Sequence, residues 1–235
     1  MLKSIFKSVA FASVLALTAG ATHATTVSYQ GGDAFGTNGH AGVTVTSIAD
    51  PVESVGASAG GFSLKGNIYG TGSVNFVAWC LDITHYLASS ADYVVTNTPF
   101  IGDALTAVQQ TNIGKLFNSA YAGLVLTNSS QSAGFQLALW EIIYENPANV
   151  FVLASGNLQV TGDSGALAAG QAFLNNLSNP ATQAWNLTFL QSTGIGEKQD
   201  QNLVTATPVP VPAAMGLMLL ALGGLAVVGR RRRAA

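Results

Sequence analysis

Apolar segments at both ends of the chain restrict the part that can fold as a domain to residues 25–206. Residues 1–24 have a positively charged start, a short apolar run and small residues that end at Ala24, the pattern of a secretory signal peptide. Residues 213–229 form an uncharged run near the minimum length for a membrane-spanning helix. We therefore predict an exported domain between two targeting segments, with cleavage after Ala24.

The C-terminus carries a second, more specific pattern. Residues 207–212 form a proline-rich spacer, and residues 230–235 form a tail that begins with four arginines and is expected to stay in the cytoplasm. The ending resembles the PEP-CTERM sorting signal of Gram-negative envelope proteins in its Val-Pro-Leu-Pro-Ala variant, although the glutamate of Pro-Glu-Pro is absent. The matching residues are Val209, Pro210, Val211, Pro212, Arg230, Arg231, Arg232 and Arg233.

This resemblance covers only residues 209–235, and it concerns processing rather than the domain. It implies an exosortase-like protease as a partner. Before processing, the protein is expected to be anchored in the membrane of the cell envelope through residues 213–229. Cleavage would then release it to the surface or the matrix.

The domain between the two ends is acidic. The chain has nine Lys and Arg residues and eleven Asp and Glu residues, but only three of the basic residues, all lysines, lie within residues 25–206. Such a surface repels phosphate backbones, so nucleic-acid binding is disfavoured. His40, His85 and Cys80 lack the spacing of zinc ligands, so neither a metal nor a cofactor is expected.

Hydrophobic periodicity predicts an α+β fold. Alternating, β-branched stretches predict strands in the first part of the domain, and apolar residues at helical spacing predict a pair of helices within 103–146. Residues 135–144 are apolar on all sides, so this helix is expected to be buried. The fold class is therefore a β-rich, barrel-like or sandwich-like domain with an inserted helix pair. Strands are predicted at 43–46, 61–66, 73–80, 93–96, 158–160, 185–190 and 203–205, and a third helix at 166–177.

Cys80 is the one cysteine of the chain. Oxidising compartments favour paired cysteines, so a lone cysteine in an exported protein suggests an intermolecular bond, a free thiol or another covalent fate. The plainer alternative is an unreactive buried side chain in a non-covalent structural envelope protein.

A hydrolase is a third hypothesis with weaker support. Residues 56–60 match the G-x-S-x-G motif around Ser58, but an alternating strand follows where a nucleophile elbow needs a helix. Cys80 and His85 would form a cysteine-protease pair, although five residues along a strand and turn give an unfavourable geometry. We therefore expect that the protein is not an enzyme.

Two segments together suggest a specific covalent chemistry. Cys80 follows an apolar, strand-like stretch, and Gln136 opens the sequence Gln-Leu-Ala-Leu-Trp. These segments resemble the thioester domains of bacterial surface adhesins, in which a strand cysteine is joined to the glutamine of a Thr-Gln-x-Ala-Ile-Trp motif. Here Leu139 replaces the isoleucine and Phe135 replaces the threonine. The resemblance covers roughly residues 60–205 and implies a thioester between Cys80 and Gln136.

The resemblance also implies a function, that of a covalent adhesin that captures an amine on an unknown surface or matrix partner. Neighbouring side chains would support the bond, because a thiol proton must be removed and water must be kept out. Cys80 and Gln136 are expected to serve the reaction rather than the packing of the fold. The supporting candidates are Asp82, His85, Glu141, Trp79, Phe135 and Trp140.

Overall fold

The computed structural model of the chain describes residues 24–47, 53–96, 104–146, 148–178, 184–194 and 200–209. The predicted signal peptide up to residue 23, the apolar segment 213–229 and the arginine tail lie outside the described residues. Within the described ranges, no helix combines the length and the hydropathy needed to cross a membrane.

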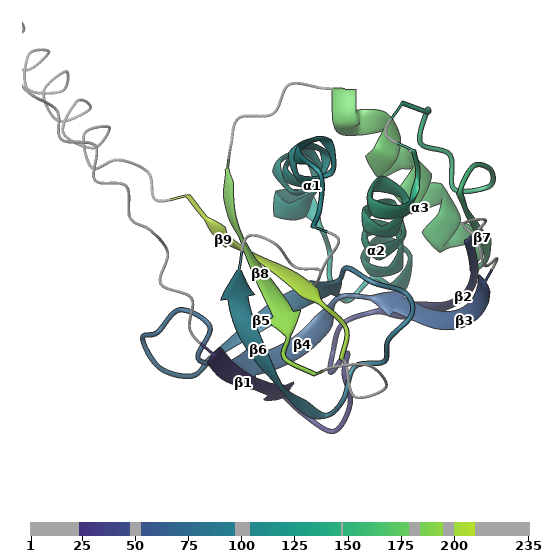
Figure 1. The fold of residues 1–235 in the computed structure, drawn as a ribbon. Helices are drawn as coiled ribbons and strands as arrows, with labels where there is room; N and C mark the ends of the chain where they lie inside the picture. The colour runs from purple at the N-terminus through teal and green to yellow at the C-terminus, as the bar shows by residue number, and fades with distance from the viewer. Residues whose placement is uncertain are drawn as a thin grey trace, which may run out of the picture.

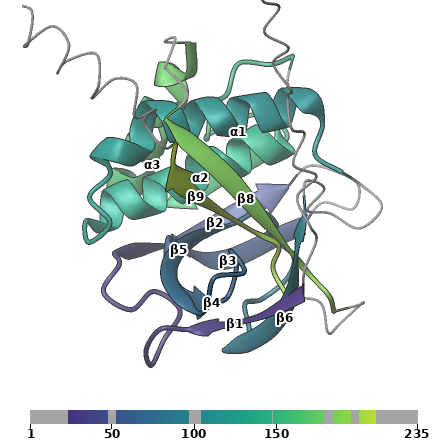
Figure 2. The same ribbon diagram turned by 90° about the vertical axis from the view of Figure 1, so that its left-hand side faces the viewer.

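Six antiparallel strands close into a barrel in the order β1, β4, β5, β9, β8, β6 (Figures 1 and 2). A closed sheet leaves no exposed strand edge, so this part of the molecule needs no further cover. The bounds are β1 Ala24–Tyr29, β4 Phe62–Gly66, β5 Val74–Cys80, β6 Ser90–Thr96, β8 Trp185–Ser192 and β9 Leu203–Pro208.

A second, open sheet has the order β3, β2, β7 and is also antiparallel. One face is apolar, with Val43, Val45 and Ala59 buried, and this face packs against a helix. The other face is exposed and consists of small polar residues and glycines, including Gly42 and Ser58. The strands are β2 His40–Ser47, β3 Glu53–Gly60 and β7 Leu158–Gly162.

Three helices lie together against one face of the open sheet and beside one side of the barrel (Figures 1 and 2). Each starts at a residue that caps it: Thr106 with a capping box, Asn128 and Asp163, whose side chains accept hydrogen bonds from main-chain N–H groups of the first turn. The helices are α1 Ala107–Ala120, α2 Ser129–Tyr144 and α3 Ser164–Asn175, with short 3-10 turns η1 Tyr121–Gly123 and η2 Asn176–Ser178.

The central helix, α2, is buried on every side from Ser132 to Ile143, which confirms the prediction from its all-apolar sequence. It contacts α1, α3, the open sheet and β5. Its crossing with α3 is close because Gly134 and Gly170 face each other there. A Cβ atom on Gly134 would lie 2.7 Å from the Cβ of Ala169 and 2.9 Å from the main-chain oxygen of Ala166.

The structure confirms the predicted α+β class and differs from the sequence-based elements in three places. Strand β3 was not predicted, because glycine, alanine and serine give it no β-branched pattern. Strand β1 includes Ala24, the residue before the predicted cleavage point. Strand β9 continues to Pro208, so the first residues of the predicted spacer pair with β8.

Replacing two helical glycines by alanine should have opposite effects on stability. Gly114→Ala in α1 has open space around the new Cβ and should gain up to about 1 kcal/mol from helix propensity. Gly134→Ala gains the same propensity but overpacks the α2–α3 crossing. The difference between the two free energies of unfolding, measured in urea, should therefore be about 1–3 kcal/mol. Equal values would show that α3 moves aside at no cost.

Candidate functional site

The site begins where strand β3 separates from strand β5. Strand β4 pairs with β5 as far as Phe62 and Ala78, and continued pairing would place Gly60 opposite Cys80. Gly60 instead pairs with His40 of β2. The chain therefore leaves the barrel at Gly60 and Gly61. A Cβ on Gly60 would lie 2.8 Å from a main-chain oxygen, so no side chain fits at this branch.

A single stripe of α2 fills the gap between the separated strands. Ser132, Gln136 and Trp140 are four residues apart, so they lie on one face of the helix. The hydroxyl oxygen of Ser132 accepts a hydrogen bond from the main-chain N–H of Gly61 at 3.0 Å. All three side chains are buried, with exposed fractions of at most 2%.

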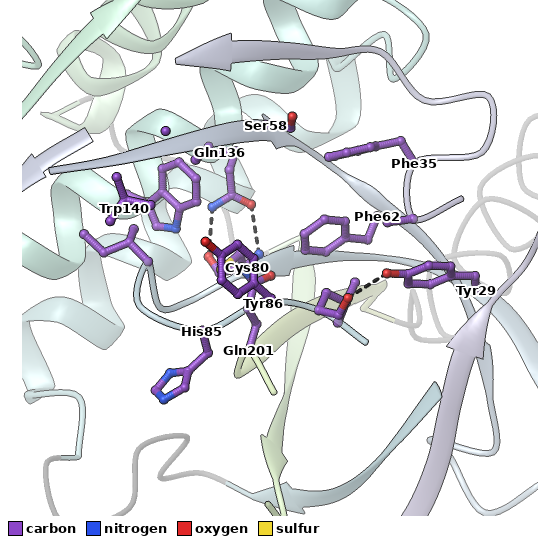
Figure 3. Close-up of a pocket in the computed structure, with 16 residues that line it drawn as sticks. Tyr29, Phe35, Ser58, Phe62, Cys80, His85, Tyr86, Gln136, Trp140 and Gln201 are labelled. Carbon is purple, nitrogen blue, oxygen red and sulfur yellow. Dashed lines mark hydrogen bonds between the residues drawn. The ribbon is translucent and has the colours of Figure 1, made fainter. Parts of the chain in front are cut away.

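The amide of Gln136 takes the place of the missing strand beside Cys80 (Figure 3). The main-chain N–H of Cys80 donates to Oε1 of Gln136 at 2.8 Å, and Nε2 of Gln136 donates to the main-chain oxygen of Cys80 at 2.8 Å. The next N–H along the chain, that of Leu81, donates to the main-chain oxygen of Asn202 on the β9 side. The main chain of Cys80 therefore faces α2, and two hydrogen bonds join Cys80 to Gln136.

This pairing has a chemical consequence. It fixes the carboxamide of Gln136 beside the residue that carries the thiol, and such positioning raises the effective concentration of two reacting groups. The N–H of Cys80 also points at Oε1, the atom that would carry negative charge if the amide carbon were attacked. An electrophilic carbon, a nucleophile and an oxyanion donor thus lie in one buried place.

The thiol of Cys80 is free, buried and protonated at neutral pH. Burial raises its pKa well above the ordinary value, and the nearby carboxylate of Asp82 raises it further. The thiol donates to the main-chain oxygen of Asp82. The indole of Trp140 acts in the other direction and favours the thiolate. Its Nε1 has no hydrogen-bond partner of ordinary geometry among the described residues.

Asp82 and His85 form a hydrogen-bonded turn directly after Cys80. Oδ1 of Asp82 lies 3.0 Å from Nδ1 of His85, and Oδ2 accepts the main-chain N–H of Asn202 at 2.8 Å. Burial raises the pKa of the Asp82 carboxyl, although these hydrogen bonds oppose the shift. The predicted titratable neighbours Asp82 and His85 therefore do lie next to the cysteine, and the His85 side chain is 29% exposed.

A cleft of about 280 Å³ leads from the surface to the Cys80–Gln136 pair. In Figure 3, Ser58 on its strand lies above the pair, and His85 and Gln201 lie below it. The lining is largely aromatic and aliphatic. It includes Tyr29, Phe35, Phe62, Tyr86 and Trp140.

A second cavity, of about 440 Å³, lies on the other side of the Asp82–His85 turn, against the start of α1 and the end of α2. His85 borders both cavities. The fully buried Asn202 also lines the second cavity, and its Nδ2 has no hydrogen-bond partner among the described residues. The acid–histidine pair therefore separates the cleft from a second, partly polar space.

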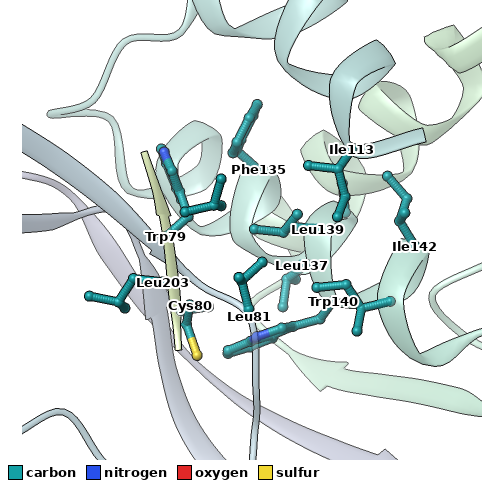
Figure 4. Packing of buried hydrophobic residues seen from close by; sticks show 14 of the residues in the cluster. Trp79, Cys80, Leu81, Ile113, Phe135, Leu137, Leu139, Trp140, Ile142 and Leu203 are labelled. Carbon is teal, nitrogen blue, oxygen red and sulfur yellow. The ribbon is translucent and has the colours of Figure 1, made fainter. Parts of the chain in front are cut away.

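Two of the predicted shielding residues lie elsewhere. Side chains of neighbouring residues on a strand point to opposite faces, so Trp79 points away from Cys80 and towards the helices (Figure 4). Its ring lies 4.5 Å from that of Phe135, which also contacts Phe117 and Phe173. Trp79 and Phe135 therefore form an aromatic core cluster, and Trp140 alone of the three predicted aromatics lines the cleft.

Glu141 also lies away from the site. It is fully buried at the other side of α2, where Oε1 accepts the main-chain N–H of Val152 at 2.7 Å. Burial raises its pKa to about 7. One turn later, Glu145 accepts hydrogen bonds from the same loop, including the N–H of Asn157 at 2.6 Å. These two carboxylates hold the loop after α2 and have no contact with the cysteine.

The geometry does not support the hydrolase hypothesis for Ser58. Ser58 lies in the middle of β3, its side chain is exposed, and strand β4 follows where a nucleophile elbow needs a helix. His85 bonds to Asp82, while the Cys80 thiol donates to a main-chain oxygen. Among the residues that the structure describes, no cluster of three His, Cys, Asp or Glu side chains could hold a metal.

Sequence reasoning missed three residues that complete the site: Ser132, Gln201 and Asn202. Ser132 precedes Gln136 by one helical turn, and this spacing was the available signal. Gln201 and Asn202 are far from Cys80 in the sequence, and only the pairing of β5 with β9 brings them near. The side-chain oxygen of Gln201 is buried without a partner among the described residues.

No family model matches the sequence, and no curated protein matches it. Two solved structures are similar in fold. The first is the N-terminal domain of the Streptococcus pyogenes pilus tip adhesin Cpa, with 20% identity, 64% of this chain and 85% of that chain covered, and a TM-score of 0.39. The second is the N-terminal thioester domain of a surface protein from Clostridium perfringens, with 11% identity, coverage of 63% and 89%, and a TM-score of 0.39. Both are domains of bacterial surface proteins. Likenesses this low assign no function, which has to come from the residues of this chain.

The stability of the protein should depend on pH through Glu141. Its pKa in the folded state is raised from 4.5 to about 7, so its contribution to stability is full below pH 4.5 and is lost as the pH rises through 7. Glu141→Gln should remove this fall in the midpoint of urea unfolding. Burial alone would raise the pKa of Glu145, but hydrogen bonds lower it, so Glu145→Gln should instead cost stability at neutral pH. An unchanged pH profile in Glu141→Gln would contradict the assignment.

Proposed function

We propose that Cys80 and Gln136 form an internal thioester with which the protein captures an amine on a partner. The observation that carries the proposal is the two-point pairing of the Gln136 amide with the main chain of Cys80 in a buried site. A glutamine needed only for packing would not have to present its amide to the one cysteine of the chain. The surrounding groups supply what the chemistry requires.

Formation of the bond releases ammonia. The Cys80 sulfur attacks the side-chain carbonyl carbon of Gln136, the C–N bond breaks, and the thiol proton leaves with the amide nitrogen as ammonia. The main-chain N–H of Cys80 stabilises the oxyanion at Oε1. Because the thiol is protonated, its proton must first be accepted, and the Asp82–His85 pair is the nearest acceptor with access to water. The Trp140 indole favours the thiolate that attacks.

Capture reverses the roles of the leaving group and the nucleophile. The nitrogen of a primary amine attacks the acyl carbon, the C–S bond breaks, and one amine proton passes to the sulfur. The products are an amide between Gln136 and the partner and a free Cys80 thiol. Each molecule reacts once, so this is covalent attachment rather than turnover.

The proposed setting is the outside of the cell. The sequence of residues 1–24 and 209–235 supports export, a temporary membrane anchor and exosortase-like processing. A thioester also suits an exported chain, because its single cysteine meets no second cysteine of the same molecule. We therefore propose a covalent adhesin of the cell envelope or matrix. The amine-bearing partner belongs to a surface or matrix that the protein meets.

The thioester predicts a loss of mass. Protein purified at low pH without amines should weigh less than its sequence by one ammonia, and digestion should give a peptide that links Cys80 to Gln136. Methylamine should add at Gln136 and expose one thiol, as measured by intact mass and thiol titration. Full mass would favour a structural envelope protein with an unreactive Cys80.

The control variants must respect the structural role of Gln136. Gln136→Ala would leave the buried N–H and C=O of Cys80 unpaired at a cost of about 1–3 kcal/mol each, so the expectation that the pair serves only the reaction is wrong. Cys80→Ser keeps the pairing and removes the thiol. It should keep a wild-type unfolding midpoint but lose both the mass deficit and the methylamine adduct.

The sorting signal predicts a shorter mature chain. Protein from the surface of its native host should lack residues 230–235, because an exosortase-like protease would remove them with the membrane segment. Peptide mapping of the C-terminus measures this directly. Expression in a host without such a protease should leave the arginine tail in place and the protein in the membrane fraction. Surface protein that retains the tail would exclude this route.

A further inference from the structure

The outer edge of strand β3 forms one side of the cleft. Four consecutive residues of this strand, Val55 to Ser58, line the cleft. Consecutive side chains on a strand point to opposite faces of the sheet, so one face alone cannot supply all four. The cleft therefore borders the edge of the strand, where main-chain N–H and C=O groups point outwards.

This edge is unpaired in the described part of the chain. Strand β3 pairs with β2 without a bulge from Ser54 to Gly60, and no other described strand pairs with it. No described residue forms a hydrogen bond with the main chain of Val55 to Ala59 from the other side. Proteins normally protect exposed edges with charges, prolines or bulges. Residues 54–60 contain none of these.

The rest of the cleft also suits an extended chain. Tyr86 is 82% exposed at the mouth, and Leu87 is held in place because its main-chain oxygen accepts the Tyr29 hydroxyl at 2.7 Å. Phe35 and Phe62 provide apolar surface near β3. An added strand needs main-chain partners on one side and pockets for alternate side chains, and the cleft offers both.

The charge around the cleft favours a cationic side chain. Asp82 lies two residues after Cys80. The charges of Asp33 and Asp200 are close enough to raise the pKa of Tyr29 in the cleft wall, after the larger effect of burial. Lys65 and Lys115, the lysines of the described part of the chain, do not line it. A lysine side chain of a partner is thus attracted to the cleft, and no lysine of the described residues competes with it there.

We propose that an extended polypeptide segment adds as a fourth strand to the outer edge of β3 and directs a lysine amine at Gln136. The covalent step rests on the proposed thioester, whereas the docking of the strand does not. Docking along β3 would explain why a thioester at this buried site reacts with a polypeptide in preference to small amines. The main chain of the partner is held along β3, and its lysine reaches down to the pair.

The test compares amine donors on the full-length chain. Methylamine needs no docking, whereas a short threonine–valine peptide with one central lysine fits the proposed strand. Two further peptides carry N-methyl groups on alternate amides. In each of them the methyl groups block one of the two hydrogen-bonding edges of the extended peptide, and the blocked edge differs between the two peptides. An added strand pairs through one edge only. One methylated peptide should therefore form its adduct about tenfold more slowly than the parent peptide, and the other should react normally, as measured by intact mass.

Two glycine variants provide a matched control. Gly56 of β3 and Gly42 of β2 are both exposed and both have open space for a side chain, but only Gly56 lines the cleft. Gly56→Arg should slow the peptide reaction about tenfold by blocking and repelling the strand, and its guanidinium adds no primary amine to the cleft. It should leave the methylamine reaction unchanged, and Gly42→Arg should change neither rate.

The outcomes separate this proposal from the proposed function. Equal rates for the parent and both methylated peptides, or covalent dimers of the chain in place of peptide adducts, would overturn strand addition by a partner polypeptide. A chain that fails to react even with methylamine would overturn the thioester instead. Docking is then measured by the fluorescence anisotropy of the labelled peptides with Cys80→Ser. Weaker binding of only one methylated peptide supports the docking site, and equal binding of the parent and both methylated peptides overturns it.

Discussion

The side-chain amide of Gln136 occupies the position where a neighbouring strand would otherwise pair with Cys80. The division of the fold into a barrel and an open sheet depends on this replacement of a strand by a side chain. Strand β3 can leave the barrel and join the open sheet only if the main chain of Cys80 finds other partners. Two hydrogen bonds of 2.8 Å from Gln136 supply them, and Ser132 does the same for Gly61 one helical turn earlier. Because unpaired buried main-chain groups are costly, the separation of the strands and the burial of α2 require each other.

This arrangement gives one residue both a structural and a chemical role. Gln136 holds the fold with the same two atoms, Oε1 and Nε2, that thioester formation would change. Loss of Nε2 as ammonia would leave the main-chain oxygen of Cys80 without its donor, in a place that is 1% exposed. The unpaired polar atoms of Trp140, Gln201 and Asn202 lie around the same site. Buried polar groups are normally paired, so these three are groups that the proposed chemistry could use.

Local sequence patterns were sufficient to predict elements whose apolar side chains alternate or repeat at helical spacing. They were insufficient to predict which residues meet through the pairing of strands that are distant in the sequence. The strand ending at Cys80 and the buried helix carrying Gln136 follow from alternation and from an all-apolar run. The roles of Trp79, Phe135 and Glu141 do not, because closeness in sequence says nothing about which face of a strand or helix a residue occupies. Phe135 and Glu141 each flank the stripe of Ser132, Gln136 and Trp140, and both turn into other parts of the core. Asn202 joins the site only through the pairing of β5 and β9, which no local pattern contains.

Strand β3 shows why one kind of sequence is both hard to predict and useful. Its glycine, alanine and serine residues carry no β-branched signal, so the segment resembles a loop with a chance G-x-S-x-G motif. Side chains this small let it approach α2 closely on one face. They also leave its outer edge uncovered beside the cleft, where larger or charged residues would have closed it. A strand with a strong local signal would have been predicted from the sequence, but its bulk would have filled the space through which the Cys80–Gln136 pair is reached.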